Sequence, residues 1–263
     1  MKWRWIVLAL GLALPLAAQT PVPSLTAEEV IGRFLERSQT TTNRLASQHH
    51  TCVRRTVTEE LGDDGVVKER KTKEQAVELR GEEQRVHLLK LDDRAPSADD
   101  VKREQAREAE QHKRLIERKD KPRRQGPDFV DEKLIRRFHY ESDTIEMVNG
   151  RPAYVLAFSP TTDLAVKENA DRALNLLVGR IWIDAEAFEL VKVDAHLKEP
   201  LTVLGGVVAK VERLDFTVER RRMEDGLWFN TKLVTHAEGR KLFTAFHIRS
   251  NIEQADFRPL PAP

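Results

Sequence analysis

Cysteine is nearly absent from this chain of 263 residues, which contains one, Cys52. A single thiol cannot form a disulfide within the chain, so an apolar core has to stabilise the fold. The simplest interpretation of Cys52 is a small residue inside a strand. The alternative left open is a bridge to a second chain or a reactive thiol.

Recognisable catalytic and metal-binding motifs are missing as well. The sequence has no HExxH motif, no nucleophile elbow and no glycine loop that would cradle a phosphate. His49 and His50 are adjacent, so within a strand their side chains point to opposite faces and cannot ligate one metal without a bulge. We therefore expect no enzyme, no catalytic residue, no metal site and no cofactor.

The chain also lacks an excess of charge of either sign. Lys and Arg number 44 and Asp and Glu 43, and residues 1–18 contain two of the cations and none of the acids. Binding to nucleic acid relies on a cationic surface that displaces counterions from phosphates. The balance of charges therefore argues against a nucleic-acid partner.

A long apolar run stands at the N-terminus. It extends from Trp5 to Leu16, follows two cations and ends in Ala17-Ala18-Gln19. This pattern predicts a secretory signal peptide over residues 1–18, cleaved after Ala18. The run is too short to span a bilayer, and no cysteine follows it for lipid attachment. We expect an exported, soluble periplasmic protein that does not span the membrane.

One helix and three strands are predicted after a linker at residues 19–25. Thr26 and Glu29 form a capping box for an amphipathic helix that ends near Leu45. Polar-rich alternating segments then predict strands at about 48–61, 66–79 and 84–91.

Residues 92–127 interrupt the strands as a charged helical insertion. Ser97 can cap a helix over about 98–121, whose apolar stripe is too thin for a core helix, so we interpret it as a solvated excursion. Its basic residues could meet lipid headgroups or an acidic partner, but acids are interleaved with them. Next, helical spacing predicts a helix over 129–138 that docks on the sheet through Phe129, Val130, Leu134, Ile135 and Phe138.

Two more hairpins are predicted in the middle of the chain. Asn149-Gly150 favours a tight turn that sets Ile145 opposite Tyr154 and Met147 opposite Pro152. The hairpin of residues 180–197 has two alternative registers. A two-residue turn groups Ile181, Ile183, Phe188 and Leu190 on one face, whereas a four-residue turn aligns Trp182 with Val191.

The last fifty residues predict a three-stranded meander with one dry face. A turn at Asp225-Gly226 pairs Val218 with Leu233, Phe216 with Thr235 and Leu214 with Ala237. A turn at Gly239-Arg240 would set Leu233 against Phe246 and Thr231 against Ile248. Since side chains alternate along a strand, both turns assign the same residues to the dry face.

These elements predict an α+β fold: a half-open antiparallel β-barrel of about nine to eleven strands with covering helices. We expect a single domain over residues 26–258, followed by a C-terminal tail at 259–263.

The order of these parts resembles the periplasmic lipoprotein-carrier superfamily, which includes the outer-membrane lipoprotein-sorting proteins. The residues that carry the resemblance are Gly179-Arg180-Ile181-Trp182-Ile183-Asp184 and the preceding hairpin Val148-Asn149-Gly150-Arg151-Pro152-Ala153-Tyr154. The resemblance implies a barrel whose concave apolar side is covered by helices and accepts acyl chains. It transfers no individual site residue, and the charged insertion departs from the compact carriers.

Two functional hypotheses follow. In the first, a lipid acyl chain or a lipoprotein binds in a cavity between the sheet and a lid formed by the first helix and the 129–138 helix. Each buried methylene would contribute about 0.8 kcal/mol, so no polar motif is needed. The candidate wall consists of Leu214, Phe216, Val218, Leu233, Phe246 and Ile248, with Trp182 near the rim.

In the alternative, the core is filled and the protein is an envelope sensor or scaffold. It would then bind a protein partner through exposed strand edges or the charged helix. The apolar sheet face would be ordinary core in that case. A hydrolase with dispersed site residues ranks third.

Overall fold

The computed structural model describes residues 22–46, 49–80, 83–117, 132–161, 169–203, 209–242 and 244–260. The predicted signal peptide, residues 118–131 and the last three residues lie outside this part. The helices are α1 (Ala27–Ala46), α2 (Ala98–Glu117), α3 (Glu132–Ile135) and α4 (Asn169–Leu174). The strands are β1 (His49–Leu61), β2 (Val67–Arg80), β3 (Glu83–Leu91), β4 (Phe138–Val148), β5 (Arg151–Pro160), β6 (Leu177–Asp184), β7 (Leu190–Leu197), β8 (Leu201–Val203), β9 (Ala209–Arg222), β10 (Trp228–Lys241) and β11 (Thr244–Pro259).

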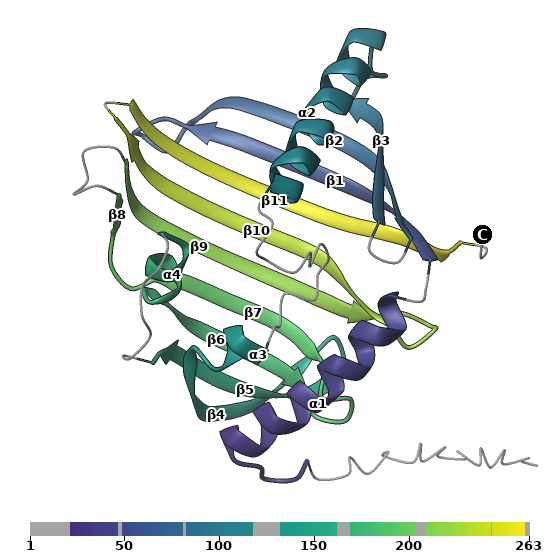
Figure 1. Ribbon diagram of the computed structural model, residues 1–263. Helices are drawn as coiled ribbons and strands as arrows, with labels where there is room; N and C mark the ends of the chain where they lie inside the picture. Colours follow the sequence, from purple (N-terminus) through teal and green to yellow (C-terminus); the bar gives the residue numbers. More distant parts are fainter. Residues whose placement is uncertain are drawn as a thin grey trace, which may run out of the picture.

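All the described strands belong to one antiparallel sheet of 11 strands. Its order is β3-β2-β1-β11-β10-β9-β7-β6-β5-β4, with β8 pairing beside β9. The sheet does not close, so β3 and β4 are its edges, and α1 and α2 lie on the same side of it (Figure 1). The predicted fold class, an open antiparallel barrel with covering helices, is confirmed.

The first helix forms as its sequence predicts. Glu29 accepts a hydrogen bond from the Thr26 backbone N–H at 2.8 Å, and the Glu29 N–H donates to Thr26 Oγ1 at 3.3 Å, which completes the capping box. Val30 and Phe34, one turn apart, are buried against the sheet. The apolar stripe of α1 therefore faces the sheet.

Apolar side chains gather on both sides of the β4–β7 half of the sheet. The larger cluster joins Val30 and Phe34 of α1 to Tyr154, Leu156 and other residues of the inner face. A smaller cluster on the outer face contains Ala153, Val155, Trp182, Val191 and Trp228. Because neighbouring strand residues point to opposite faces, β5 and β6 contribute to both clusters.

The predicted register between β9 and β10 is confirmed. Val218 pairs with Leu233, Phe216 with Thr235 and Leu214 with Ala237. The turn itself differs, since Met223 and Leu227 pair around three residues that end in Gly226, which has a φ of 81°. A bulge at Thr231 restores the predicted pairing.

The predicted register between β10 and β11 is wrong. Ala237 pairs with Ile248 and Leu233 with Ile252, and β10 continues through Gly239 to Lys241. Gly239 is needed for a close approach instead of a turn: a Cβ there would lie 2.2 Å from the Lys210 carbonyl oxygen. The turn therefore comes later in the chain than Gly239-Arg240. The shift in register leaves the same side chains on the dry face.

The other two hairpins are placed as follows. Ile145 pairs with Tyr154 and Met147 with Pro152, as the Asn149-Gly150 turn predicts. In the next hairpin Ile183 pairs with Leu190, which corresponds to the four-residue turn. A bulge then pairs Trp182 with Lys192, so Val191 is not its partner.

The predicted helix over 129–138 is shorter in the structure. Helix α3 covers Glu132–Ile135, residues 129–131 lie outside the described part, and Phe138 begins β4. Ile135 is buried in the inner cluster, so the docking of this segment on the sheet is as expected.

Helix α2 begins at the predicted cap and is not wholly a solvated excursion. Asp100 accepts from the Ser97 N–H at 3.0 Å. Glu104 then accepts hydrogen bonds from Lys73 at 2.7 Å and Gln75 at 3.0 Å, both on β2. The first half of α2 is therefore bound to the inner face of the sheet.

Candidate functional site

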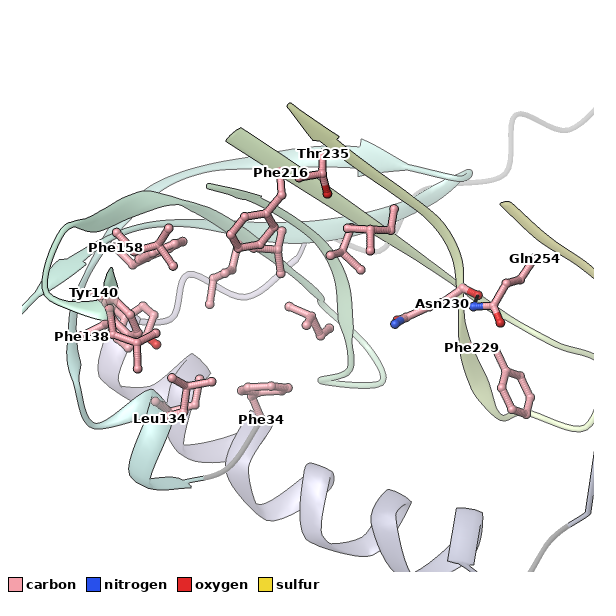
Figure 2. A pocket seen from close by; sticks show the side chains of 18 of the residues that line it. Phe34, Leu134, Phe138, Tyr140, Phe158, Phe216, Phe229, Asn230, Thr235 and Gln254 are labelled. Carbon is pink, nitrogen blue, oxygen red and sulfur yellow. Dashed lines mark hydrogen bonds between the residues drawn. The ribbon is translucent and has the colours of Figure 1, made fainter. Parts of the chain in front are cut away.

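A cavity of about 660 Å³ lies between the inner face of the sheet and helices α1 and α3. Volumes of about 300–1,000 Å³ are typical of small-molecule sites. Figure 2 shows aromatic side chains from α1, β4, β5, β9 and β10 around it, with Phe34 and Leu134 projecting from the helices. Much of the wall is apolar and includes Phe34, Leu134, Phe138, Tyr140, Phe158 and Phe216.

The aromatic end of the cavity is well packed. Phe138 meets Phe158 edge to face with ring centroids 5.1 Å apart, and the ring of Tyr140 lies 6.5 Å from that of Phe158. Burial raises the pKa of the Tyr140 phenol far above its usual value, so this end is poorly solvated. It can receive an apolar group and has little to offer a charged one.

The opposite end combines polar side chains with a pair of stacked rings. Asn230 and Gln254 lie there beside Phe229 (Figure 2), whose ring is 4.8 Å from that of Phe257, and Arg54 and Gln84 also line the cavity. Gln254 donates from Nε2 to the Asn230 carbonyl at 3.0 Å and is 3.6 Å from the Cys52 sulfur. Burial raises the pKa of the Cys52 thiol, which favours the unreactive thiol over the thiolate.

A second hollow of about 880 Å³ continues along the inner face beneath α2. It is lined by β1, β2, β3 and α2, and it is rich in charged side chains such as Lys73, Arg103 and Glu104. Arg54 and Gln84 line both hollows. The inner face of the sheet thus forms one trough with an apolar half under α1 and a polar half under α2.

Helix α1 is attached to the sheet by a small number of polar contacts. Arg37 Nε donates to Glu189 Oε1 at 3.1 Å, and Glu189 is buried beside Arg220. The Tyr154 hydroxyl donates to the Pro23 carbonyl at 2.8 Å, and the Arg33 guanidinium lies 5.1 Å from the centre of the Phe188 ring. These contacts hold the N-terminal segment over the cavity.

Three of the seven predicted wall residues line the cavity: Phe216, Val218 and Leu233. Leu214 is on the same face of β9 but lies beyond the lining. Phe246 and Ile248 also lie outside it, because the shifted β10–β11 register places them near the far end of β10.

Trp182 is placed away from the cavity. It belongs to the outer cluster, donates from Nε1 to Glu146 at 2.8 Å and lies 4.3 Å beneath the Lys192 ammonium. Its neighbours Ile181 and Ile183 point to the inner face instead. The expectation that Trp182 lies at the cavity rim is therefore corrected.

Several lining residues were not on the predicted wall. Phe34 and Leu134 were assigned to the lid helices, whereas Tyr140, Phe229 and Arg54 were not singled out. Strict alternation along β4 would put Tyr140 on the face opposite to Ile145. A bulge between Ser142 and Thr144 shifts the register, so that Tyr140 pairs with Phe158, and alternation alone could not have found it. The sequence holds no signal for Arg54, because its place depends on the pairing of β1 with β11, which are far apart in the chain.

Within the described ranges, no group of three or more His, Cys, Asp or Glu side chains could hold a metal ion. None of the helices seen there has the length and apolar character needed to cross a membrane.

Comparisons with known proteins gave structural matches alone. No family model matches the sequence. No curated protein matches it either. Among solved structures, a LolA superfamily protein from Nitrosomonas europaea is 12% identical with a TM-score of 0.33, covering 91% of this chain and 96% of its own.

Two further solved structures are similar at the same level. A putative outer membrane lipoprotein-sorting protein domain from Vibrio parahaemolyticus is 11% identical with a TM-score of 0.34, over 88% of this chain and 91% of its own. The MucA/MucB complex of Pseudomonas aeruginosa matches at 11% identity and a TM-score of 0.25, over 90% of this chain and 100% of the other. Values this low carry no argument about function. Structures of the LolA superfamily and of a lipoprotein-sorting domain are nevertheless among those that this chain matches, as the order of its parts predicted.

Proposed function

We propose that this protein is an exported, periplasmic and non-enzymatic carrier that binds a lipid acyl chain, free or as part of a lipoprotein, in the cavity beneath α1. The observation that carries the proposal is the cavity itself. It is open, mostly apolar and about 660 Å³ in volume, at a place where a filled core would pack helix directly against sheet. Interiors of proteins are otherwise closely packed.

The geometry also supplies the driving force. Aromatic and aliphatic side chains surround the space, so each methylene moved there from water gains about 0.8 kcal/mol. Affinity of this kind depends on the shape of the cavity and on the burial of apolar surface, and it requires no sequence motif. This explains why the sequence shows no recognisable site.

Native mass spectrometry of protein purified from a cell envelope tests the proposal. We expect masses of bound lipid, and we expect a bound fluorescent fatty acid to be displaced by palmitate. A mass equal to that of the bare chain, together with no binding of the fluorescent fatty acid, would refute acyl binding.

A second candidate function is the binding of an envelope protein partner. It is favoured by the edge strand β4, where Ile145 and Met147 are 43% and 60% exposed. An edge strand can pair with an extended segment of another protein. Replacing both with Lys should abolish such an interaction while leaving fatty-acid binding unchanged, which separates the two functions.

A further inference from the structure

The trough changes character at one place, where Arg54 and Gln84 line both of its halves. On one side of this junction the wall is aromatic and aliphatic, ending at Phe138, Tyr140 and Phe158 (Figure 2). On the other side are charged residues of β2 and α2. A ligand that fits both sides has an apolar chain and a polar head.

Arg54 is the cation best placed to meet such a head. It lies in the middle of the sheet, where its partners in register are Gln75 on β2 and Gln254 on β11. No acid forms an ion pair with it among the residues that the structure describes. Among the other cations of the polar half, Lys73 binds Glu104 at 2.7 Å and Arg103 binds Asp100 at 2.8 Å, whereas Arg107 is exposed on α2.

The surroundings of Arg54 favour an anion. Burial lowers the pKa of its guanidinium, although the group stays charged at neutral pH, and Cys52 and Glu108 act on it electrostatically. Burial and the neighbouring Glu104 raise the pKa of Glu108, the acid that acts on Arg54, and the two side chains form no ion pair within the described structure. A partly buried guanidinium without an ion pair gains most from a planar or tetrahedral anion that accepts two hydrogen bonds.

Neutral polar groups complete the junction. The side chains of Gln84, Asn230 and Gln254 line the same end of the cavity. Asn230 Oδ1 is buried and accepts no hydrogen bond within the described structure. The amide groups at this end can therefore accept a hydrogen bond from a hydroxyl of the head and donate hydrogen bonds to an anion.

We propose that the ligand is an anionic amphiphile whose acyl chain fills the apolar cavity and whose carboxylate or phosphate is bound by Arg54 at the junction of the two hollows. This inference rests on the proposed acyl-binding function. It adds the charge of the head and the direction of the chain, which extends from Arg54 towards Phe158. A fatty acid and a phospholipid both have the required chemistry.

Displacement of a bound fluorescent fatty acid by three competitors with the same chain length tests the inference. The competitors are palmitate, palmitoyl lysophosphatidate and hexadecanol, which carry a carboxylate, a phosphate and a neutral hydroxyl. We expect wild-type protein to bind the two anions about 10- to 100-fold more tightly than hexadecanol. The anion that binds more tightly identifies the source of the ligand.

The Arg54→Gln variant should lose this preference and leave the affinity for hexadecanol unchanged. Its matched control is Arg55→Gln, because Arg55 neighbours Arg54, points to the other face and lies 3.8 Å from Asp93. Equal affinities for all three competitors in wild-type protein would overturn the inference and leave acyl binding intact. Failure of wild-type protein to bind any of them would refute the proposed function itself. The comparison on wild-type protein keeps the test valid even if Arg54→Gln does not fold.

Discussion

At the scale of single residues, Asp184 organises the hairpin that carries the Trp-Ile-Asp segment. Its side chain is 1% exposed and accepts two hydrogen bonds from Arg151, at 2.6 and 2.9 Å. It also accepts from the backbone N–H groups of Glu186 and Ala187, which closes the turn after β6. Burial opposes the charged form, but these hydrogen bonds outweigh it and lower the pKa of Asp184.

The substitution Asp184→Asn tests this arrangement. An amide keeps one acceptor but loses the ion pair, so we expect the free energy of unfolding to fall by roughly 1.5–3 kcal/mol in urea titrations. Glu186→Gln is the control, because Glu186 contacts the same arginine but is 67% exposed and should matter little. Similar losses in the two variants would show that burial of Asp184 is unimportant.

The residue scale also shows what the sequence could reveal about the site. Phe216, Val218 and Leu233 were predicted as cavity wall from a turn at Asp225-Gly226, and their register is correct because a bulge at Thr231 offsets the longer turn of the structure. Phe246 and Ile248 were misplaced because Gly239 resembles a turn residue in sequence and proves to be a packing residue in space. Nothing local in a sequence distinguishes these two uses of glycine.

At the scale of elements, replacing each of two glycines with alanine is expected to change the free energy of unfolding in opposite directions. Gly239→Ala in β10 would bring a Cβ within 2.9 Å of Phe246 and closer still to backbone, so we expect a loss of about 1–3 kcal/mol in the free energy of unfolding. Gly32→Ala in α1 meets no atom within 4 Å and should stabilise the protein by about 0.5–1 kcal/mol. Thermal unfolding of both variants measures these effects, and a neutral Gly239→Ala would contradict the close approach.

Helix α1 is the element on which access to the cavity depends. Its attachment combines the burial of Val30 and Phe34 with the pair Arg37–Glu189. The capping box made this helix predictable from sequence, whereas its partner Glu189 is 152 positions away and carries no local signal. Long-range ion pairs of this kind follow from the fold and cannot be derived before it.

Replacing Arg37 with Met should loosen α1 without unfolding the sheet. Arg37 is partly exposed, so we expect a loss on the order of 1 kcal/mol in the docking of the helix. Hydrogen exchange should then be several-fold faster in α1 and unchanged in β10. Glu36→Gln, an exposed change on the same helix, is the control. Unaltered exchange in α1 would show that the Arg37–Glu189 ion pair does not hold the helix on the sheet.

At the scale of the whole molecule, one sheet faces two helices that cover it differently. An apolar cavity lies between α1 and its half of the sheet. The half under α2 is polar, and hydrogen bonds from β2 to Glu104 join it to that helix. The overall class of this architecture could be predicted, because alternation and turn chemistry specify an antiparallel sheet with helices. The division of the trough could not, because it depends on which distant strands become neighbours.

The central claim is that an acyl chain binds in the cavity beneath α1, and filling that cavity tests it most directly. Leu233→Trp places an indole in the space, whereas Val234→Trp puts the same side chain on the opposite face of β10. Titration with the fluorescent fatty acid measures affinity, and circular dichroism verifies that both variants are folded. We expect Leu233→Trp to weaken binding at least about tenfold, or 1.4 kcal/mol, and Val234→Trp to leave it unchanged. Equal affinity in wild-type protein and a folded Leu233→Trp variant would contradict the claim.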